Sequence, residues 1–177
     1  MVVFRHCDPR WPFLRDDPAQ APARWHAAGR GPAHYFVDTP VGAWAEFLRH
    51  EEIRDVEDLA GVRRSLWAVE IPDSGWHVPR LPAPTLFGDP NSWPACQADA
   101  DRLRKAGHVR LRAPSAALIE GGAAGWNCDG EERPVKRRDG FVHVLFGAPR
   151  ELIGWPVVES GSPPARVLPL VRHFKDE

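Results

Sequence analysis

The stretch 24–50, RWHAAGRGPAHYFVDTPVGAWAEFLRH, decides the expected fold because it sets an arginine, a tyrosine and a glutamate on successive pieces of backbone. Arg24 stands before a glycine-containing turn that Pro32 closes. Tyr35 lies in the short apolar run 34–37, which predicts a strand. The glutamate belongs to the segment that follows this strand.

That following segment predicts a helix. Thr39 is a suitable N-cap and Pro40 suits the first helical position. Apolar residues then recur at helical spacing and define one arc: Ala43, Trp44, Phe47 and Leu48. Glu46 falls outside this arc, on the side of Gly42 and His50, so the core does not require it. A solvated surface glutamate is the competing interpretation.

Composition indicates a globular chain that forms one domain over residues 1–177. Of the 177 residues, 43% are apolar and 27% are charged, which suits a packed core rather than disorder. The net charge of −1 argues against a large nucleic-acid footprint, so no direct nucleic-acid partner is expected. No apolar run is long enough to cross a bilayer, and no membrane partner is expected.

The chain contains three cysteines: Cys7, Cys96 and Cys128. Their odd number, their wide spacing and the lack of a signal-peptide pattern predict reduced thiols in the cytoplasm. No CxxC or HExxH spacing accompanies the eight histidines, so no metal site is predicted.

Along the rest of the chain, strands are expected to outnumber helices. Strands are predicted at 2–6, 64–71, 108–112, 141–146 and 165–171, a second helix at 91–106, and loops at 9–22, 72–90 and 121–138. This order is not a regular βαβ alternation, which favours an α+β fold. No GxGxxG follows the first strand, so a Rossmann nucleotide site is not indicated.

Several of these segments, taken in order, resemble the signature of the RES domain family. Arg24 matches the arginine of a GRW-like turn, with Ala23 in place of the usual glycine. Tyr35 matches a strand tyrosine, and Glu46 matches the glutamate of an A-x-x-E helix. Ser115, in the segment APSAAL, matches the later serine, and Arg5, in VVFRH, matches an N-terminal arginine. The resemblance runs from residue 5 to about residue 155.

The resemblance implies a specific fold and substrate. RES domains resemble ADP-ribosyltransferases, so we expect a split, mainly antiparallel sheet, flanked by helices, around a NAD+-binding cleft. Glu46 would stabilise positive charge at the ribose, and Arg24 and Ser115 would complete the catalytic set. Arg5 and Arg24 would bind phosphate groups bidentately. NAD+ is then a substrate, and no cofactor is implied.

Each of the other residues has a structural alternative. Tyr35 would stack on nicotinamide or bind it through its hydroxyl, but it also suits a half-buried strand. Ser115 suits a turn that bonds its own backbone. Arg5 and Arg24 suit surface charges or salt bridges. His6 replaces an aromatic residue found in relatives and would stack on the ligand or carry charge toward phosphate.

Three functions are compatible with this resemblance. The first is a toxin that degrades NAD+ by phosphorolysis, with inorganic phosphate as co-substrate, giving nicotinamide and ADP-ribose 1″-phosphate. The second is a mono-ADP-ribosyltransferase acting on a protein, and the third is an inactive RES-fold binding module. The resemblance also implies an Xre-type antitoxin partner and a homodimer.

Overall fold

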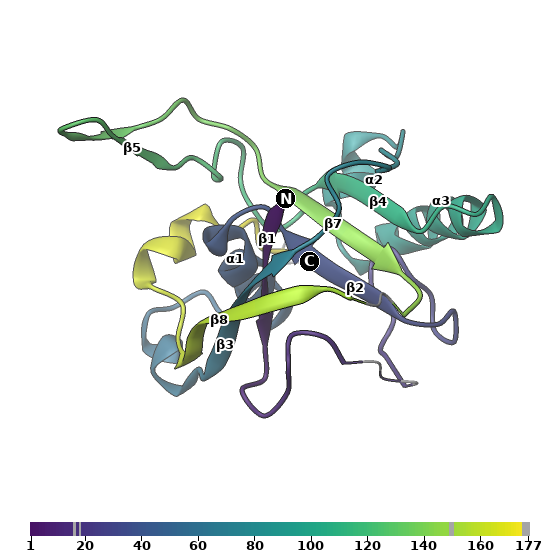
Figure 1. Ribbon diagram of the computed structural model, residues 1–177, viewed down its shortest axis with the longest axis horizontal. Helices are drawn as coiled ribbons and strands as arrows, with labels where there is room; N and C mark the ends of the chain where they lie inside the picture. The colour runs from purple at the N-terminus through teal and green to yellow at the C-terminus, as the bar shows by residue number, and fades with distance from the viewer. Residues whose placement is uncertain (16, 18, 149–150, 175–177) are drawn as a thin grey trace.

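Two three-stranded halves, joined edge to edge, make up the sheet of the computed structural model, which describes residues 1–15, 17, 19–148 and 151–174 (Figure 1). The strand order is β4-β7-β2-β1-β3-β8, and all neighbours are antiparallel. The strands are β1 Val2–Cys7, β2 Ala33–Val37, β3 Arg64–Glu70, β4 Arg110–Pro114, β7 Phe141–Phe146 and β8 Ile153–Gly161.

The sheet is split between β1 and β2. Only Phe4 and Val37 are in register across this junction, whereas β1 pairs with β3 through six positions and β2 with β7 through five. The predicted α+β fold with a split, mainly antiparallel sheet is therefore confirmed. The two halves of the sheet are therefore joined at this junction by a single registered pair.

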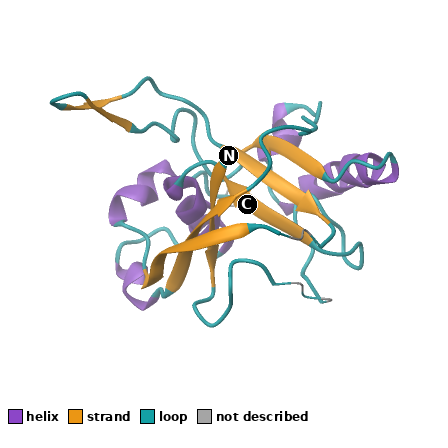
Figure 2. Cartoon of the chain, viewed as in Figure 1, coloured by secondary structure: helices purple, strands orange, loops and turns teal. Residues whose placement is uncertain are grey.

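The helices flank this sheet (Figure 2). They are α1 Pro40–His50, α2 Ala83–Phe87 and α3 Trp93–Lys105, together with the 3-10 helices η1 Glu57–Gly61, η2 Pro90–Ser92 and η3 Ala165–Leu170. The predicted start of α1 is confirmed, since Thr39 Oγ1 accepts a 3.0 Å hydrogen bond from the Gly42 amide. The second predicted helix begins as η2 and continues as α3.

Two apolar clusters hold the sheet and helices together. The larger one contains the predicted arc of α1 (Ala43, Trp44, Phe47 and Leu48) and the buried face of α3 (Cys96, Ala100 and Leu103). The smaller one packs Val3, Phe36, Val69, Ile71 and Leu145 together. Burial of the arc fixes the rotation of α1, and Glu46 is consequently only partly covered.

The predicted last strand, 165–171, is wrong. This segment forms η3, while the last strand is β8, which the sequence analysis missed. β8 lies at the sheet edge and pairs only with β3, and its outward apolar side chains Ile153, Trp155 and Val157 are exposed. The half-buried alternation that marks an interior strand is therefore missing, and Pro156 weakens the strand pattern further.

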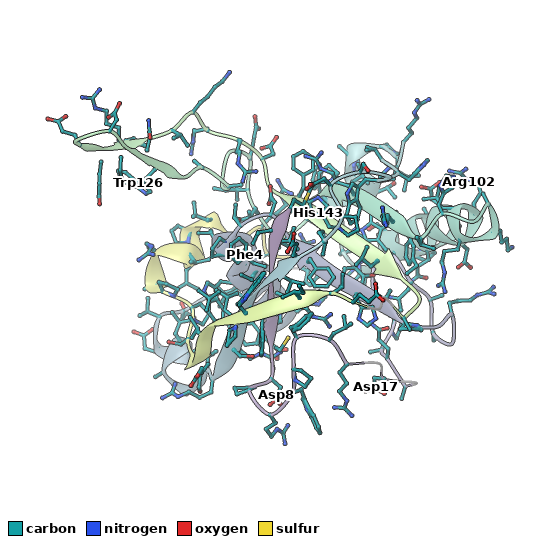
Figure 3. All side chains as sticks on the ribbon, viewed as in Figure 1. Phe4, Asp8, Asp17, Arg102, Trp126 and His143 are labelled. Atoms are coloured by element: carbon teal, nitrogen blue, oxygen red, sulfur yellow. The ribbon has the colours of Figure 1, made fainter. Side chains whose placement is uncertain are left out.

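Two predicted loops contain regular structure. The segment 72–90 includes α2, and the segment 121–138 includes a hairpin of β5 Trp126–Cys128 and β6 Glu132–Pro134. Figure 1 shows this hairpin extending away from the sheet, and Figure 3 shows Trp126 projecting from it. All its strand residues are exposed, so no burial pattern in the sequence could indicate it.

Candidate active site

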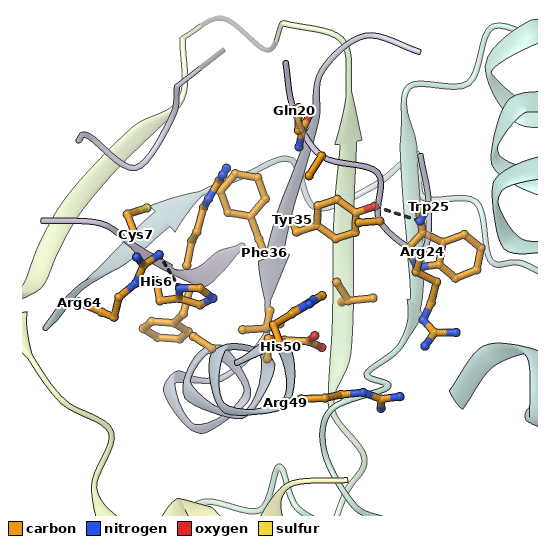
Figure 4. Close-up of a pocket in the computed structure, with 18 of the residues that line it drawn as sticks. His6, Cys7, Gln20, Arg24, Trp25, Tyr35, Phe36, Arg49, His50 and Arg64 are labelled. Atoms are coloured by element: carbon orange, nitrogen blue, oxygen red, sulfur yellow. Dashed lines mark hydrogen bonds between the residues drawn. The ribbon is translucent and has the colours of Figure 1, made fainter. Parts of the chain in front are cut away.

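A cavity of about 600 Å³ opens beside α1, next to the Phe4–Val37 junction (Figure 4). Five of the six predicted site residues line it: Arg5, His6, Arg24, Tyr35 and Glu46. The sixth, Ser115, lies behind Glu46 and contacts its carboxylate. The volume falls within the range of about 300–1,000 Å³ that is usual for small-molecule sites.

Ser115 holds the carboxylate of Glu46. Its Oγ donates to Glu46 Oε1 at 3.0 Å and accepts from the amides of Ala117 and Leu118 at 3.2 and 3.3 Å. Only 4% of Ser115 is exposed, so its hydroxyl is committed to these three groups. The turn-serine interpretation is confirmed, and Ser115 also orients Glu46, while its predicted part in catalysis and NAD+ binding stays a prediction.

Glu46 differs from the other acids of the cavity wall. Asp8 binds Arg10 through both carboxylate oxygens, at 3.0 and 2.7 Å, and Asp17 accepts from the Ala19 amide at 2.9 Å. Figure 3 labels both aspartates at the loop after β1. Glu46 has only the serine hydroxyl as a hydrogen-bond partner among the described residues. Like the exposed Asp17 it has acceptor capacity left for a ligand, but Glu46 is half-buried on a helix and oriented by a buried serine.

Arg24 lies at one end of the cavity and faces the segment 85–92. Its Nη1 donates to the Thr85 carbonyl at 2.8 Å and to Ser92 Oγ at 3.1 Å, and its Nη2 donates to the Gly88 carbonyl at 2.6 Å. These bonds tie α2 and η2 to the cavity wall. The predicted contact of Arg24 with a phosphate stays a prediction, since much of its donor capacity is used within the chain.

Arg49, which the sequence analysis did not select, shares the Gly88 carbonyl with Arg24. Its Nη2 donates to Phe87 and Gly88 at 3.0 and 2.8 Å, and its Nη1 donates to Ala116. Burial lowers the pKa of Arg49 to about 10, so the guanidinium is still cationic at neutral pH. Arg49 follows Glu46 by one helical turn, and it brings a second fixed positive charge beside that carboxylate.

Tyr35 places its ring in the cavity wall and turns its hydroxyl away into the protein. The hydroxyl accepts from the Trp25 amide at 3.0 Å and lies 3.0 Å from His26 Nδ1. Since His26 Nε2 donates to the Ala21 carbonyl at 2.8 Å, Nδ1 accepts the tyrosine proton. Burial raises the pKa of Tyr35, which keeps the phenol neutral. The ring is therefore the part of Tyr35 that a ligand can touch.

Arg5 and His6 of β1 and Arg64 of β3 line the cavity on one side, and Figure 4 labels His6 and Arg64 there. Arg64 Nη2 donates to His6 Nδ1 at 3.2 Å, and the His6 ring meets Phe47 edge-on at 5.3 Å between centroids. Burial, followed by the charges of Arg64 and Arg5, lowers the pKa of His6 to about 3. His6 is consequently neutral at pH 7, and the predicted alternative in which it carries charge toward phosphate is not supported.

Burial makes the cysteine at this end a poor nucleophile. Burial raises the pKa of the Cys7 thiol, although Arg5 and Arg64 oppose the shift. The thiol is therefore protonated at neutral pH, and thiolate chemistry is not favoured. Charge stabilisation by Glu46 is left as the chemistry that this cavity can best support.

Three cavity residues were missed because their role depends on distant neighbours. Arg49 and Arg64 are ordinary helix and strand arginines in the sequence. Trp93, at the start of α3, lines the cavity with its indole Nε1 buried and without a hydrogen-bond partner among the described residues. The one local signal for any of these three is that Arg49 stands three positions after Glu46, which puts the two side chains on the same face of the helix.

The fold and cavity define an α+β protein with a split antiparallel sheet and a pocket lined by several arginines and the half-buried Glu46. The sequence model of the RES domain matches residues 3–135 of the 177, and the chain belongs to this family. All six predicted site residues fall inside the matched region. No curated protein sequence matches the chain significantly. The family is associated with toxin-like activity on NAD+.

Neither a metal-binding cluster nor a membrane-spanning helix is present in the described ranges. No group of three or more metal-ligating side chains comes together in the described ranges. Among the helices in the same part of the chain, none is long and apolar enough to cross a membrane.

Proposed function

We propose that the protein is a toxin that cleaves the ribose–nicotinamide bond of NAD+, with inorganic phosphate as the acceptor. The products would be nicotinamide and ADP-ribose 1″-phosphate. One observation carries this proposal: Glu46 is a half-buried carboxylate in the cavity wall, oriented by Ser115, with acceptor sites still available.

The chemistry of the bond suits such a carboxylate. Loss of nicotinamide develops positive charge at the ribose, and a fixed negative charge nearby stabilises that transition state. Ser115 restricts the rotation of the Glu46 side chain, so little reorganisation is needed as the charge develops. The Tyr35 ring offers an apolar face beside the same space for the nicotinamide or the ribose.

The cations of the wall support a dinucleotide substrate. Arg5, Arg24, Arg49 and Arg64 line the cavity. NAD+ carries a pyrophosphate, and phosphorolysis brings a further anion, so several guanidinium groups match the charge of the ligands. Transfer of ADP-ribose to a protein would use the same carboxylate, and the dependence on phosphate separates the two reactions.

The test is incubation of the purified protein with NAD+, with and without orthophosphate, followed by mass analysis of the products. We expect nicotinamide release that requires phosphate, together with a product of the mass of ADP-ribose 1″-phosphate. Release without phosphate, with ADP-ribose attached to a protein, would favour the transferase instead. No nicotinamide under any condition would reject both and leave a RES-fold binding module.

We also propose the partners that the family implies: an Xre-type antitoxin and a second copy of the chain in a homodimer. Expression in bacteria without an antitoxin should lower cellular NAD+ and stop growth. Light scattering that shows a monomer at all concentrations would contradict the dimer.

A further inference from the structure

Arg5 and Arg64 differ from the cavity arginines Arg24 and Arg49 in what their guanidinium groups contact. Arg24 and Arg49 each donate to three oxygen atoms of the chain. Arg5 lies 3.4 Å from a ring nitrogen of His34 and over the Phe36 ring, with 5.6 Å from Cζ to the centroid, and Arg64 donates to His6 at 3.2 Å. A guanidinium has five N–H donors, so most donors of this pair are unused within the described residues.

The two positive charges also lack a carboxylate. No ion pair involves Arg5 or Arg64 in the part of the chain that the structure describes. The nearby acid Asp8 is occupied by Arg10. The Nε atom of Arg64 is buried without a hydrogen-bond partner, which is costly for a charged donor unless something else binds there.

His6 fixes Arg64 without neutralising it. Because Arg64 can only donate, His6 Nδ1 must accept, and the ring is neutral. The Arg64 guanidinium also lies over the Phe47 ring, with 5.3 Å from Cζ to the centroid. These two contacts hold the Arg64 guanidinium against the cavity wall, and the positive charges of Arg5 and Arg64 are not neutralised.

We propose that Arg64, positioned by His6, joins Arg5 in a phosphate-binding subsite on the β1–β3 side of the cavity. The ligand class is a phosphate group, and it has two sources if the proposed function holds: the pyrophosphate of NAD+ or the co-substrate orthophosphate. Arg24 and Arg49 serve mainly to hold the opposite wall, because their donors are taken by chain oxygens.

The test measures binding of orthophosphate, ADP and NAD+ by calorimetry to the parent, to Arg64→Gln and to Arg63→Gln. Arg63 is the matched control, since it is the exposed neighbour of Arg64, bonds only to the carbonyls of Ala60 and Val62, and does not line the cavity. We expect Arg64→Gln to weaken binding of at least one phosphate probe about tenfold or more, as for a lost charge-assisted contact. Arg63→Gln should bind like the parent.

The pattern of losses identifies the source. Weaker binding of ADP and NAD+ with unchanged orthophosphate assigns the subsite to the pyrophosphate, and the reverse pattern assigns it to the co-substrate. Arg64→Lys keeps the positive charge but loses the planar pair of donors, so its affinity for the phosphate probe should lie between those of Arg64→Gln and the parent. Such intermediate binding would show that the loss in Arg64→Gln is not caused by a folding defect. His6→Phe should weaken the same probe in the parent but have no further effect in Arg64→Gln, which a purely structural role would not produce.

Two outcomes overturn the subsite: parent-like binding of all three probes by Arg64→Gln, or no binding of any probe by the parent. The proposed function is judged separately by nicotinamide release from the parent. A parent that releases nicotinamide while Arg64→Gln binds normally leaves the function intact and rejects only the subsite. A parent that binds ADP through Arg64 without releasing nicotinamide supports the subsite and rejects the function.

Discussion

The Oγ atom of Ser115 donates a 3.0 Å hydrogen bond to Oε1 of Glu46, joining residues that are 69 positions apart in the chain. One lies on α1 and the other directly follows β4. The bond needs the helix and the far edge of the sheet to be assembled, so the candidate carboxylate is oriented only in the folded protein.

Replacing Glu46 by glutamine should separate charge from shape. The amide keeps an oxygen that can accept the Ser115 proton, so we expect the thermal midpoint to change little. Turnover of NAD+ should fall about a hundredfold or more, equivalent to roughly 2.7 kcal/mol, with NAD+ affinity nearly constant. Nicotinamide release at saturating NAD+ is the measurement. Glu51→Gln, at the exposed end of α1, is the control; equal turnover in both variants would refute the role of Glu46.

Ser115→Ala should affect both stability and rate. The buried amides of Ala117 and Leu118 lose their acceptor, which should cost about 1–3 kcal/mol of the free energy of unfolding. Glu46 keeps its charge but loses its anchor, so turnover should fall less than in Glu46→Gln, by about tenfold, with little change in KM. The exposed Ser74→Ala serves as control. A fall as large as that of Glu46→Gln would indicate direct contact between Ser115 and the substrate.

The two predicted anion-binding arginines should respond differently. Arg24→Ala leaves the carbonyls of Thr85 and Gly88 without its donors, and we expect a loss of about 3 kcal/mol in the free energy of unfolding. Arg5→Ala removes one long hydrogen bond and a cation–π contact with Phe36, leaves no chain carbonyl without a donor, and should cost about 1 kcal/mol, but should weaken NAD+ binding about tenfold or more. Chemical denaturation and NAD+ titration check both. If Arg24→Ala has the same free energy of unfolding as the parent, the structural role assigned to Arg24 is wrong.

Acid should destabilise the protein through its buried histidines. Burial, followed by the charge of Arg112, lowers the pKa of His143 from 6.5 to about 4. Below pH 6.5 the unfolded chain takes up this proton and the folded chain does not, so the free energy of unfolding should fall between pH 6.5 and 4. The slope for one such group is at most about 1.4 kcal/mol per pH unit. His6, lowered to about 3, extends the same trend to lower pH.

His143→Phe tests this acid dependence. The ring that packs edge-on against Trp76, with centroids 4.8 Å apart, is retained, while the titrating nitrogens are removed. We expect a shallower loss of stability between pH 6.5 and 4, measured by urea denaturation at several pH values. The same substitution at the exposed His108 is the control. An unchanged slope in His143→Phe would show that other groups cause the acid sensitivity.

The elements that could be predicted from the sequence are those fixed by residues close together in the chain. The N-cap Thr39, the following Pro40 and the apolar arc are all local, and α1 forms as predicted. Prediction from the sequence failed for β8 and η3, because β8 is defined by pairing with β3 rather than by its own burial pattern. The same limit applies to the site. The motif residues converge on one cavity, but the contacts that distinguish Arg24 from Arg64 come from distant carbonyl groups and a histidine.

The split of the sheet gives the cavity a mechanical importance. Because Phe4 and Val37 alone are in register between β1 and β2, the two half-sheets are weakly coupled along this line. Arg64 lies on one half-sheet and Tyr35 on the other, so a ligand that contacts both residues links the two half-sheets. Ligand binding then adds to the cohesion of the fold itself. Hydrogen exchange of the β1 and β2 amides should slow most when the cavity is filled.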